Sequence, residues 1–113
     1  MQGKTIPIYN VSYSVGQMSK KTPEILLDSG ANAHIICNQE YFTSFDPEFC
    51  YQTAILELAD GSTHNLVKGK GTAVLHMHDN LGYLRPLTLK HALLVPEFNR
   101  NILSLKQGIA NGM

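Results

Sequence analysis

The chain has 113 residues, of which 43% are hydrophobic and 16% are charged, and this balance excludes an intrinsically disordered segment. Nine Lys and Arg residues offset nine Asp and Glu residues, so the formal net charge is zero and no basic surface for nucleic acid or an anionic membrane is expected. We therefore expect residues 1–113 to form a single globular domain with no nucleic-acid and no membrane partner.

No apolar run approaches the roughly 20 residues that a membrane helix needs. The first residues also lack the apolar stretch of a secretory signal peptide. We therefore expect a cytoplasmic protein in which Cys37 and Cys50 are free thiols, buried as small apolar side chains. The two cysteines form no metal-ligand pattern, and we expect neither a metal nor another cofactor.

Strand patterns dominate the first half of the chain. Residues 5–15 predict a strand whose one face carries Tyr9, Val11, Tyr13 and Val15. A polar turn over residues 16–23 leads to Ile25–Leu27, a short and wholly apolar strand. Residues 35–37 are apolar again. Asn38 is placed to cap one helical turn, before Asp46 and Pro47 break the chain.

The middle of the chain predicts a hairpin. Residues 55–59 alternate, Asp60-Gly61 is a strong two-residue turn signal, and Leu66-Val67 returns. Gly69-Lys70-Gly71 then indicates a bend or a bulge. Residues 72–78 alternate again, with one face formed by Ala73, Leu75 and Met77 and the other by Val74, His76 and His78.

The last third predicts a turn over residues 79–82 and a long strand over residues 84–95, interrupted early by Pro86. Residues 102–107 form the one plausible helix, which Gly108 would end. About seven short strands at regular spacing are typical of an all-β barrel or sandwich, here with one short C-terminal helix.

Asp28 is the residue with the strongest functional signal. It follows three apolar residues directly, at the end of a buried strand, where desolvation of a carboxylate is expensive. Ser29 places a hydroxyl beside it, and Gly30 allows another backbone or a substrate to approach closely. Small Ala31 continues the tight packing. Asp-Ser-Gly is also a common turn, so the preceding strand and the following small residue make the pattern specific.

Glu24–Ala31 resembles the active-site segment of aspartic proteases, in which two hydrophobic residues precede Asp, Thr or Ser, Gly and Ala. The chain has only one such segment, and in this respect it resembles the half-size retroviral enzymes. Further motifs resemble the proteases of copia-type LTR retrotransposons. They occur in order between residues 24 and 107 and comprise Asp28-Ser29-Gly30-Ala31-x-x-His34, Leu58-Ala59-Asp60-Gly61-Ser62, Gly69-x-Gly71-Thr72, Leu94-Val95-Pro96 and Asn101-Ile102-Leu103-Ser104-Leu105. The wider retroviral pattern has Gly where this chain has Ser104, and the copia group tends to carry Ser there.

The resemblance implies a closed-barrel-like retropepsin (acid protease) protomer with a flap hairpin and one short C-terminal helix. It implies that Asp28 is catalytic and that Ser29, Gly30 and Ala31 support the active-site loop. The substrate-binding flap would comprise Ala59, Asp60, Gly61, Ser62 and Thr63. It also implies processing of a Gag-Pol-type polyprotein, in the cytoplasm or within virus-like particles, by an excised protease domain or a host gene derived from one.

Peptide hydrolysis without a metal or a covalent nucleophile needs a base for the water and an acid for the leaving amine. Two carboxylates about 3 Å apart provide both, because their repulsion makes them share one proton. The chain has four aspartates, and Asp46, Asp60 and Asp79 all occupy turn or break positions. The second carboxylate is therefore expected from Asp28 of a second copy, in a symmetric homodimer.

Other interpretations compete with this one. His76, His78 and Asp79 could bind zinc, since residues two apart on a strand point the same way. A cysteine protease built on Cys37 or Cys50 lacks a local signature. The alternative from another functional class is a catalytically inactive retropepsin-fold module for dimerisation or peptide binding.

Overall fold

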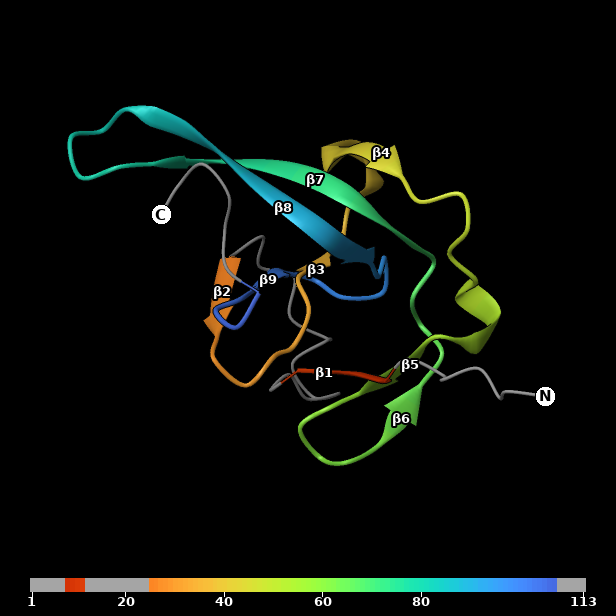
Figure 1. The fold of residues 1–113 in the computed structure, drawn as a ribbon. Coiled ribbons are helices and arrows are strands. Elements are labelled where there is room, and N and C mark those ends of the chain that lie inside the picture. Colours follow the sequence, from red (N-terminus) through yellow and green to blue (C-terminus); the bar gives the residue numbers. More distant parts are fainter. Residues whose placement is uncertain (1–7, 12–24, 108–113) are drawn as a thin grey trace.

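The computed structural model describes residues 8–11 and 25–107 (Figure 1). In this part of the chain two single-turn 3₁₀ helices occur, η2 (Gln39–Tyr41) and η3 (Tyr51–Thr53). No helix there is long and apolar enough to cross a membrane. The described strands are β1 (Ile8–Asn10), β2 (Ile25–Asp28), β3 (Ile35–Ile36), β4 (Phe42–Phe45), β5 (Ile55–Glu57), β6 (Thr63–His64), β7 (Gly69–His78), β8 (Leu84–Leu94) and β9 (Asn101–Ser104).

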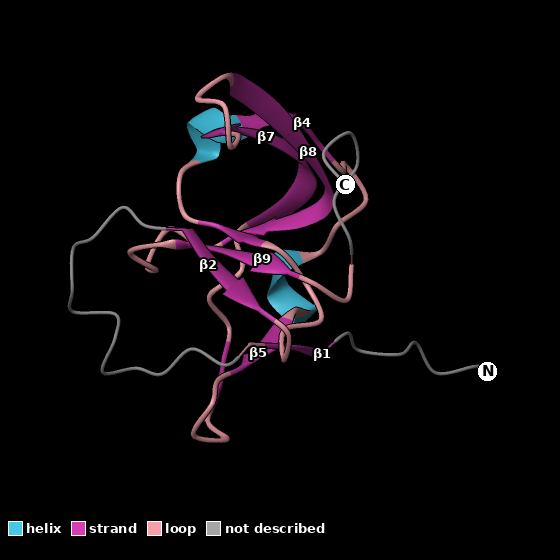
Figure 2. Cartoon of the chain, turned by 90° about the vertical axis from the view of Figure 1, so that its left-hand side faces the viewer, coloured by secondary structure: helices cyan, strands magenta, loops and turns pink. Residues whose placement is uncertain are grey.

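These strands form two sheets. The larger has the order β2-β9-β3-β8-β7-β4, and the smaller has the order β1-β5-β6. Strand β9 runs parallel to β2, with Asp28 opposite Ser104, and antiparallel to β3. The strand from the end of the described chain therefore lies between β2 and β3, which are consecutive in sequence. Figure 2 shows β2 and β9 side by side, with β5 and β1 below them.

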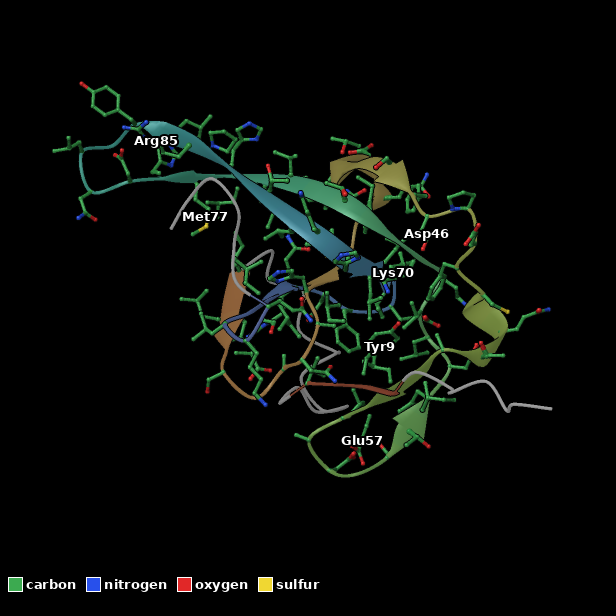
Figure 3. All side chains as sticks on the ribbon, viewed as in Figure 1. Tyr9, Asp46, Glu57, Lys70, Met77 and Arg85 are labelled. Atoms are coloured by element: carbon green, nitrogen blue, oxygen red, sulfur yellow. The ribbon has the colours of Figure 1, made fainter. Side chains whose placement is uncertain are left out.

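Two clusters of buried side chains hold the sheets. The first cluster includes Leu56 of β5 and Val11, directly after β1. It also includes Ile35 and Ile102 of the larger sheet, so it joins the two sheets. Tyr9 packs against this cluster and lies between β1 and the larger sheet (Figure 3). The second cluster lies within the larger sheet and comprises Ile36, Ala73, Leu75, Leu87, Leu89, Ala92 and Leu103.

Much of the predicted strand pattern is confirmed. Ala73 and Leu75 are buried on one face of β7, while His76 and His78 are exposed on the other. The Asn38 side chain caps η2 by accepting a hydrogen bond from the Glu40 backbone N–H over 2.9 Å, as expected. In the first predicted strand only residues 8–11 fall in the described part. Tyr13, Val15 and the predicted turn over residues 16–23 lie outside it.

The predicted helix over residues 102–107 is wrong for Ile102, Leu103 and Ser104, which belong to β9. Residues 105–107 form a turn, and Gly108 lies outside the described residues. Ile102 is buried in the first cluster and Leu103 in the second. A strand with both faces buried has a continuous apolar sequence, so periodicity alone does not separate it from a buried helix.

The predicted barrel closure is also wrong for the described strands. β2 and β4 lie at opposite edges of the larger sheet, and β1, β5 and β6 form a sheet of their own. Closure depends on pairing between strands that are distant in sequence, and local alternation carries no information on such pairs.

A bulge occurs near the predicted position, but the extra residue belongs to the partner strand. The β7–β8 register shifts between Gly71 and Ala73, where one residue of β7 faces two of β8, Lys90 and His91. His91 has a φ of 60°, the left-handed conformation that such an extra residue can adopt. Gly71 itself is required by close packing, because a Cβ there would clash with the backbone of β4 at the carbonyl oxygen of Ser44.

We therefore expect Gly71→Ala to destabilise the fold by about 2 kcal/mol or more, since the backbone of β4 must move to accept the methyl group. Gly61→Ala is the matched control. Gly61 has a φ of 86°, and a Cβ added there would meet open space, so this variant should lose about 1 kcal/mol through backbone strain alone. Urea unfolding of both variants measures the difference. Equal losses, or a smaller loss for Gly71→Ala, would contradict the packing.

Candidate active site

Asp28 ends β2, and its side chain is buried with 5% exposure. Its Oδ1 accepts a hydrogen bond from the Gly30 backbone N–H over 2.8 Å. Its backbone carbonyl accepts from the N–H groups of Ala31 and Leu105, each over 3.4 Å. The turn after β2 therefore folds back on the carboxylate and fixes its orientation.

The residues predicted to support Asp28 take different positions. Ser29 and Gly30 are exposed, so the tip of the turn faces solvent beside the buried carboxylate. Ala31 is fully buried in the first cluster. The loop thus combines an accessible tip with a buried anchor.

Residues on and after β9 hold the same loop. Ser104 is fully buried, and its Oγ donates a hydrogen bond to the carbonyl oxygen of Ala31 over 2.6 Å. The backbone N–H of Ser104 donates to Nδ1 of His34 over 3.0 Å. No local pattern in the sequence identified Ser104 as the residue that makes these contacts. The available signal was that His34 and Ser104 both belong to the motifs of the copia resemblance.

The predicted flap residues form the turn between β5 and β6. The Gly61 N–H donates to the Leu58 carbonyl over 2.9 Å, and the Leu58 N–H donates to the Ser62 carbonyl over 2.9 Å. Asp60 accepts hydrogen bonds from the hydroxyl and the backbone N–H of Ser62, and these bonds lower the pKa of the Asp60 carboxyl. A turn at Asp60-Gly61 is therefore confirmed, but the predicted two-residue connection and the return at Leu66-Val67 are wrong, because residues 58–62 separate β5 from β6 and β6 is Thr63–His64.

The hairpin and the Asp28 loop are connected through the core. Leu58, directly before the turn, and Ala31 are buried in the same cluster. Figures 1 and 2 both show the β5–β6 turn at the lower end of the molecule, toward which β2 also points. Thr63, the last predicted flap residue, begins β6 and is exposed.

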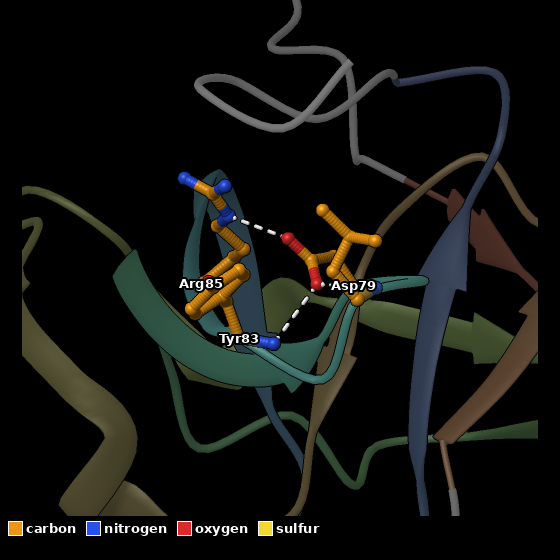
Figure 4. A network of polar contacts seen from close by, with 4 residues as sticks. Asp79, Tyr83 and Arg85 are labelled. Carbon is orange, nitrogen blue, oxygen red and sulfur yellow. Dashed lines mark hydrogen bonds and ion pairs between the residues drawn. The ribbon is translucent and has the colours of Figure 1, made fainter.

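The alternative zinc site is not assembled. Asp79 instead accepts from Nε of Arg85 over 2.9 Å and from the backbone N–H groups of Leu81 and Tyr83 (Figure 4). The Arg85 guanidinium is the largest cause of the lowered pKa of Asp79. Within residues 8–11 and 25–107, no three His, Cys, Asp or Glu side chains group as metal ligands.

Both cysteines are free thiols, as expected, but their environments differ. Cys37 is half-buried, and its Sγ donates to Oδ1 of Asn101 over 3.3 Å. Burial raises the pKa of this thiol. Cys50 is exposed, so its predicted burial is wrong. It lies in the segment between β4 and β5, where neither cluster covers it.

We expect a thiol-alkylating reagent at pH 8 to modify Cys50 first and Cys37 about tenfold more slowly. A raised pKa lowers the thiolate fraction of Cys37, and burial restricts access to the sulfur. Mass spectrometry of the native protein over time measures both rates. In a Cys50→Ser variant only the slow reaction should remain, and a fast first modification of that variant would contradict the structure.

Comparison with known proteins assigns the chain to a family. A family model described as the beta-barrel domain of Pol polyproteins matches residues 25–113. The comparison with curated proteins gave no match, and neither did the comparison with solved structures. The matched segment begins at β2 and contains the Asp28 loop, the β5–β6 hairpin and β9. Since it covers well over half of the sequence, the chain belongs to the Pol polyprotein beta-barrel domain family.

Proposed function

We propose that this chain is the protomer of a retropepsin-like aspartic endopeptidase of the copia type. The main support is the environment of Asp28. Its carboxylate is 5% exposed at the end of β2, accepts a hydrogen bond from the Gly30 N–H, and is followed by a loop with an exposed tip. Strand β9 lies between β2 and β3, the two strands that this loop connects, so β9 packs beside the loop that carries Asp28. Membership of a Pol polyprotein family supports a polyprotein as the substrate.

The proposed reaction uses a water held between two Asp28 carboxyl groups that share one proton. The unprotonated carboxylate takes a proton from the water as the water oxygen bonds to the peptide carbonyl carbon. The protonated carboxyl group gives its proton to the carbonyl oxygen. The proton now on the first carboxyl group then passes to the amide nitrogen as the C–N bond breaks. One hydroxyl of the tetrahedral intermediate returns its proton to the second carboxylate, so the pair again shares one proton.

A second copy of the chain supplies the second carboxylate in this proposal. Leu27 and Leu105, next to the Asp28 loop, are 58% and 48% exposed. Leu27 lies on the same face of β2 as Ile25, which packs against the second cluster, and pairs with Leu103 of that cluster. Leu105 lies in the turn directly after β9. An exposed continuation of a core face suits burial against another subunit. A net charge of zero adds no electrostatic repulsion between copies.

The β5–β6 turn is the proposed flap. Its tip is built from exposed residues, with Gly61 in the left-handed conformation, and it is held at its base by Leu58 in the first cluster. Such a hairpin can close over an extended substrate and donate backbone hydrogen bonds to it. Residues Ala59–Thr63 would then contact the polypeptide. The enzyme would act in the cytoplasm or within virus-like particles.

The test is cleavage of a Gag-Pol-type polyprotein or casein between pH 4 and 7, with and without pepstatin. The wild-type chain should cleave, and pepstatin should inhibit it. Asp28→Asn should lower the rate at least about 10³-fold, because neither subunit then offers an ionisable carboxyl group. Asp46→Asn is the matched control, since Asp46 is exposed in a turn and accepts a hydrogen bond from the Glu48 N–H.

Cleavage that persists in Asp28→Asn would refute the aspartic-protease proposal. Absence of cleavage by wild-type protein of verified dimer mass would instead favour the alternative, an inactive dimerisation or peptide-binding module. A loss of activity in Asp46→Asn equal to that in Asp28→Asn would remove the special role assigned to Asp28.

A further inference from the structure

Ser104 contacts the Asp28 loop at two points. Its hydroxyl donates to the carbonyl oxygen of Ala31 over 2.6 Å, and its backbone N–H donates to Nδ1 of His34 over 3.0 Å. Ser104 is 0% exposed and His34 is 1% exposed. The loop is thus fixed three and six residues after Asp28 by a single residue of β9.

The chemistry of the groups fixes the direction of each bond. A backbone N–H only donates, so Nδ1 of His34 accepts and carries no proton. A carbonyl only accepts, so the Ser104 hydroxyl proton points to Ala31. The same hydroxyl oxygen accepts from the Gln107 backbone N–H over 3.1 Å. Ser104 therefore uses its hydroxyl both as a donor and as an acceptor.

Further bonds hold the same segment from two other directions. The Leu93 N–H of β8 donates to the carbonyl oxygen of His34 over 2.9 Å. Nε2 of Gln107 donates to the carbonyl oxygen of Asn32 over 2.8 Å. These contacts place His34 between β8 and β9 and restrict the path of the loop from Asp28 to β3.

We propose that Ser104 and His34 are positioning residues that hold the Asp28 carboxyl group in its reactive geometry. This inference rests on the proposed protease function. Loss of either partner leaves a buried polar group without its hydrogen bond, which costs more than an exposed bond would. The loop would then shift, and displacement of a catalytic group by about 1 Å is enough to lower the rate of chemistry strongly.

The test uses variants that remove or keep each bond. Ser104→Ala removes the hydroxyl, and His34→Leu removes the acceptor at similar volume. His34→Asn retains an acceptor oxygen near the position of Nδ1. Ser104→Ala and His34→Leu should lower kcat about tenfold or more, with KM changed less than about threefold, while His34→Asn should keep kcat within about threefold of wild type.

A stability control separates positioning from general loss of packing. Leu75→Val removes buried volume in the second cluster, away from the Asp28 loop, and should lower Tm without lowering kcat. All variants are assayed well below their Tm and at verified dimer mass. Amide hydrogen exchange of Ser104 gives a readout that needs no activity. The exchange should accelerate in His34→Leu and stay slow in His34→Asn.

If Ser104→Ala keeps wild-type kcat, or if Leu75→Val loses as much kcat as Ser104→Ala at equal loss of Tm, the positioning role is overturned. If Ser104 exchanges as slowly in His34→Leu as in wild type, the hydrogen-bonded contact itself is overturned. A wild-type dimer without any cleavage overturns the proposed function and the catalytic role together, and the exchange rates still decide whether the contact exists.

Discussion

The insertion of β9 between β2 and β3 is the constraint on which the rest of the structure depends. It pairs Asp28 with Ser104 across parallel strands and places the intervening loop over the end of β9. Because β2 and β3 are separated by a strand, the chain from Asp28 to Ile35 must cross that end. The turn at Gly30, the buried Ala31 and the contact between His34 and Ser104 all follow from this crossing.

The same insertion divides the apolar residues of the fold between two clusters. Ile35 and Ile102 enter the cluster that joins the two sheets, while Ile36 and Leu103 enter the cluster below β7 and β8. Successive side chains of β3 and of β9 point to opposite faces of the sheet. Both strands are therefore packed into the two clusters, and they hold the ends of the Asp28 loop. Leu103 shares its face with the exposed Leu27 of β2, and exposed Leu105 follows directly after β9. In the proposed enzyme this face packs against a second copy of the chain. The same dimer would bury the exposed leucines and supply the second Asp28 carboxyl group.

The sequence was informative where a local signal decided the structure. Asn38 capped η2, Asp60-Gly61 formed a turn, and β7 alternated as predicted. The sequence was misleading where pairing between strands that are distant in the sequence determined the structure. Ile102-Leu103 has the apolar character of a buried helix or of a two-sided strand, and only its pairing with β2 and β3 selects the strand. Closure of the sheet and the position of the extra residue near His91 depend on register in the same way.

For the candidate site, the sequence identified Asp28 from its position after an apolar strand, and the structure places that carboxylate in a buried turn. The hydrogen bonds from Ser104 were beyond local reasoning, since the bonded residues are separated by about 70 positions. The motifs at residues 28–34 and 101–105 could each be recognised in the sequence. Only the folded structure shows that they are in contact.

The central claim is that one active site needs Asp28 from two chains, and subunit mixing tests it most directly. A fixed amount of wild-type protein is equilibrated with a threefold excess of Asp28→Asn chains, and cleavage is compared with that of the same wild-type protein alone. A parallel mixture with an equal excess of Asp46→Asn chains, which are expected to be active, shows that added chains do not themselves lower cleavage. Random pairing predicts that cleavage falls to about one quarter of that by wild type alone, because most wild-type chains then pair with an inactive partner. Cleavage unchanged by the excess of Asp28→Asn chains, with exchange of subunits verified by mass, would contradict a shared site.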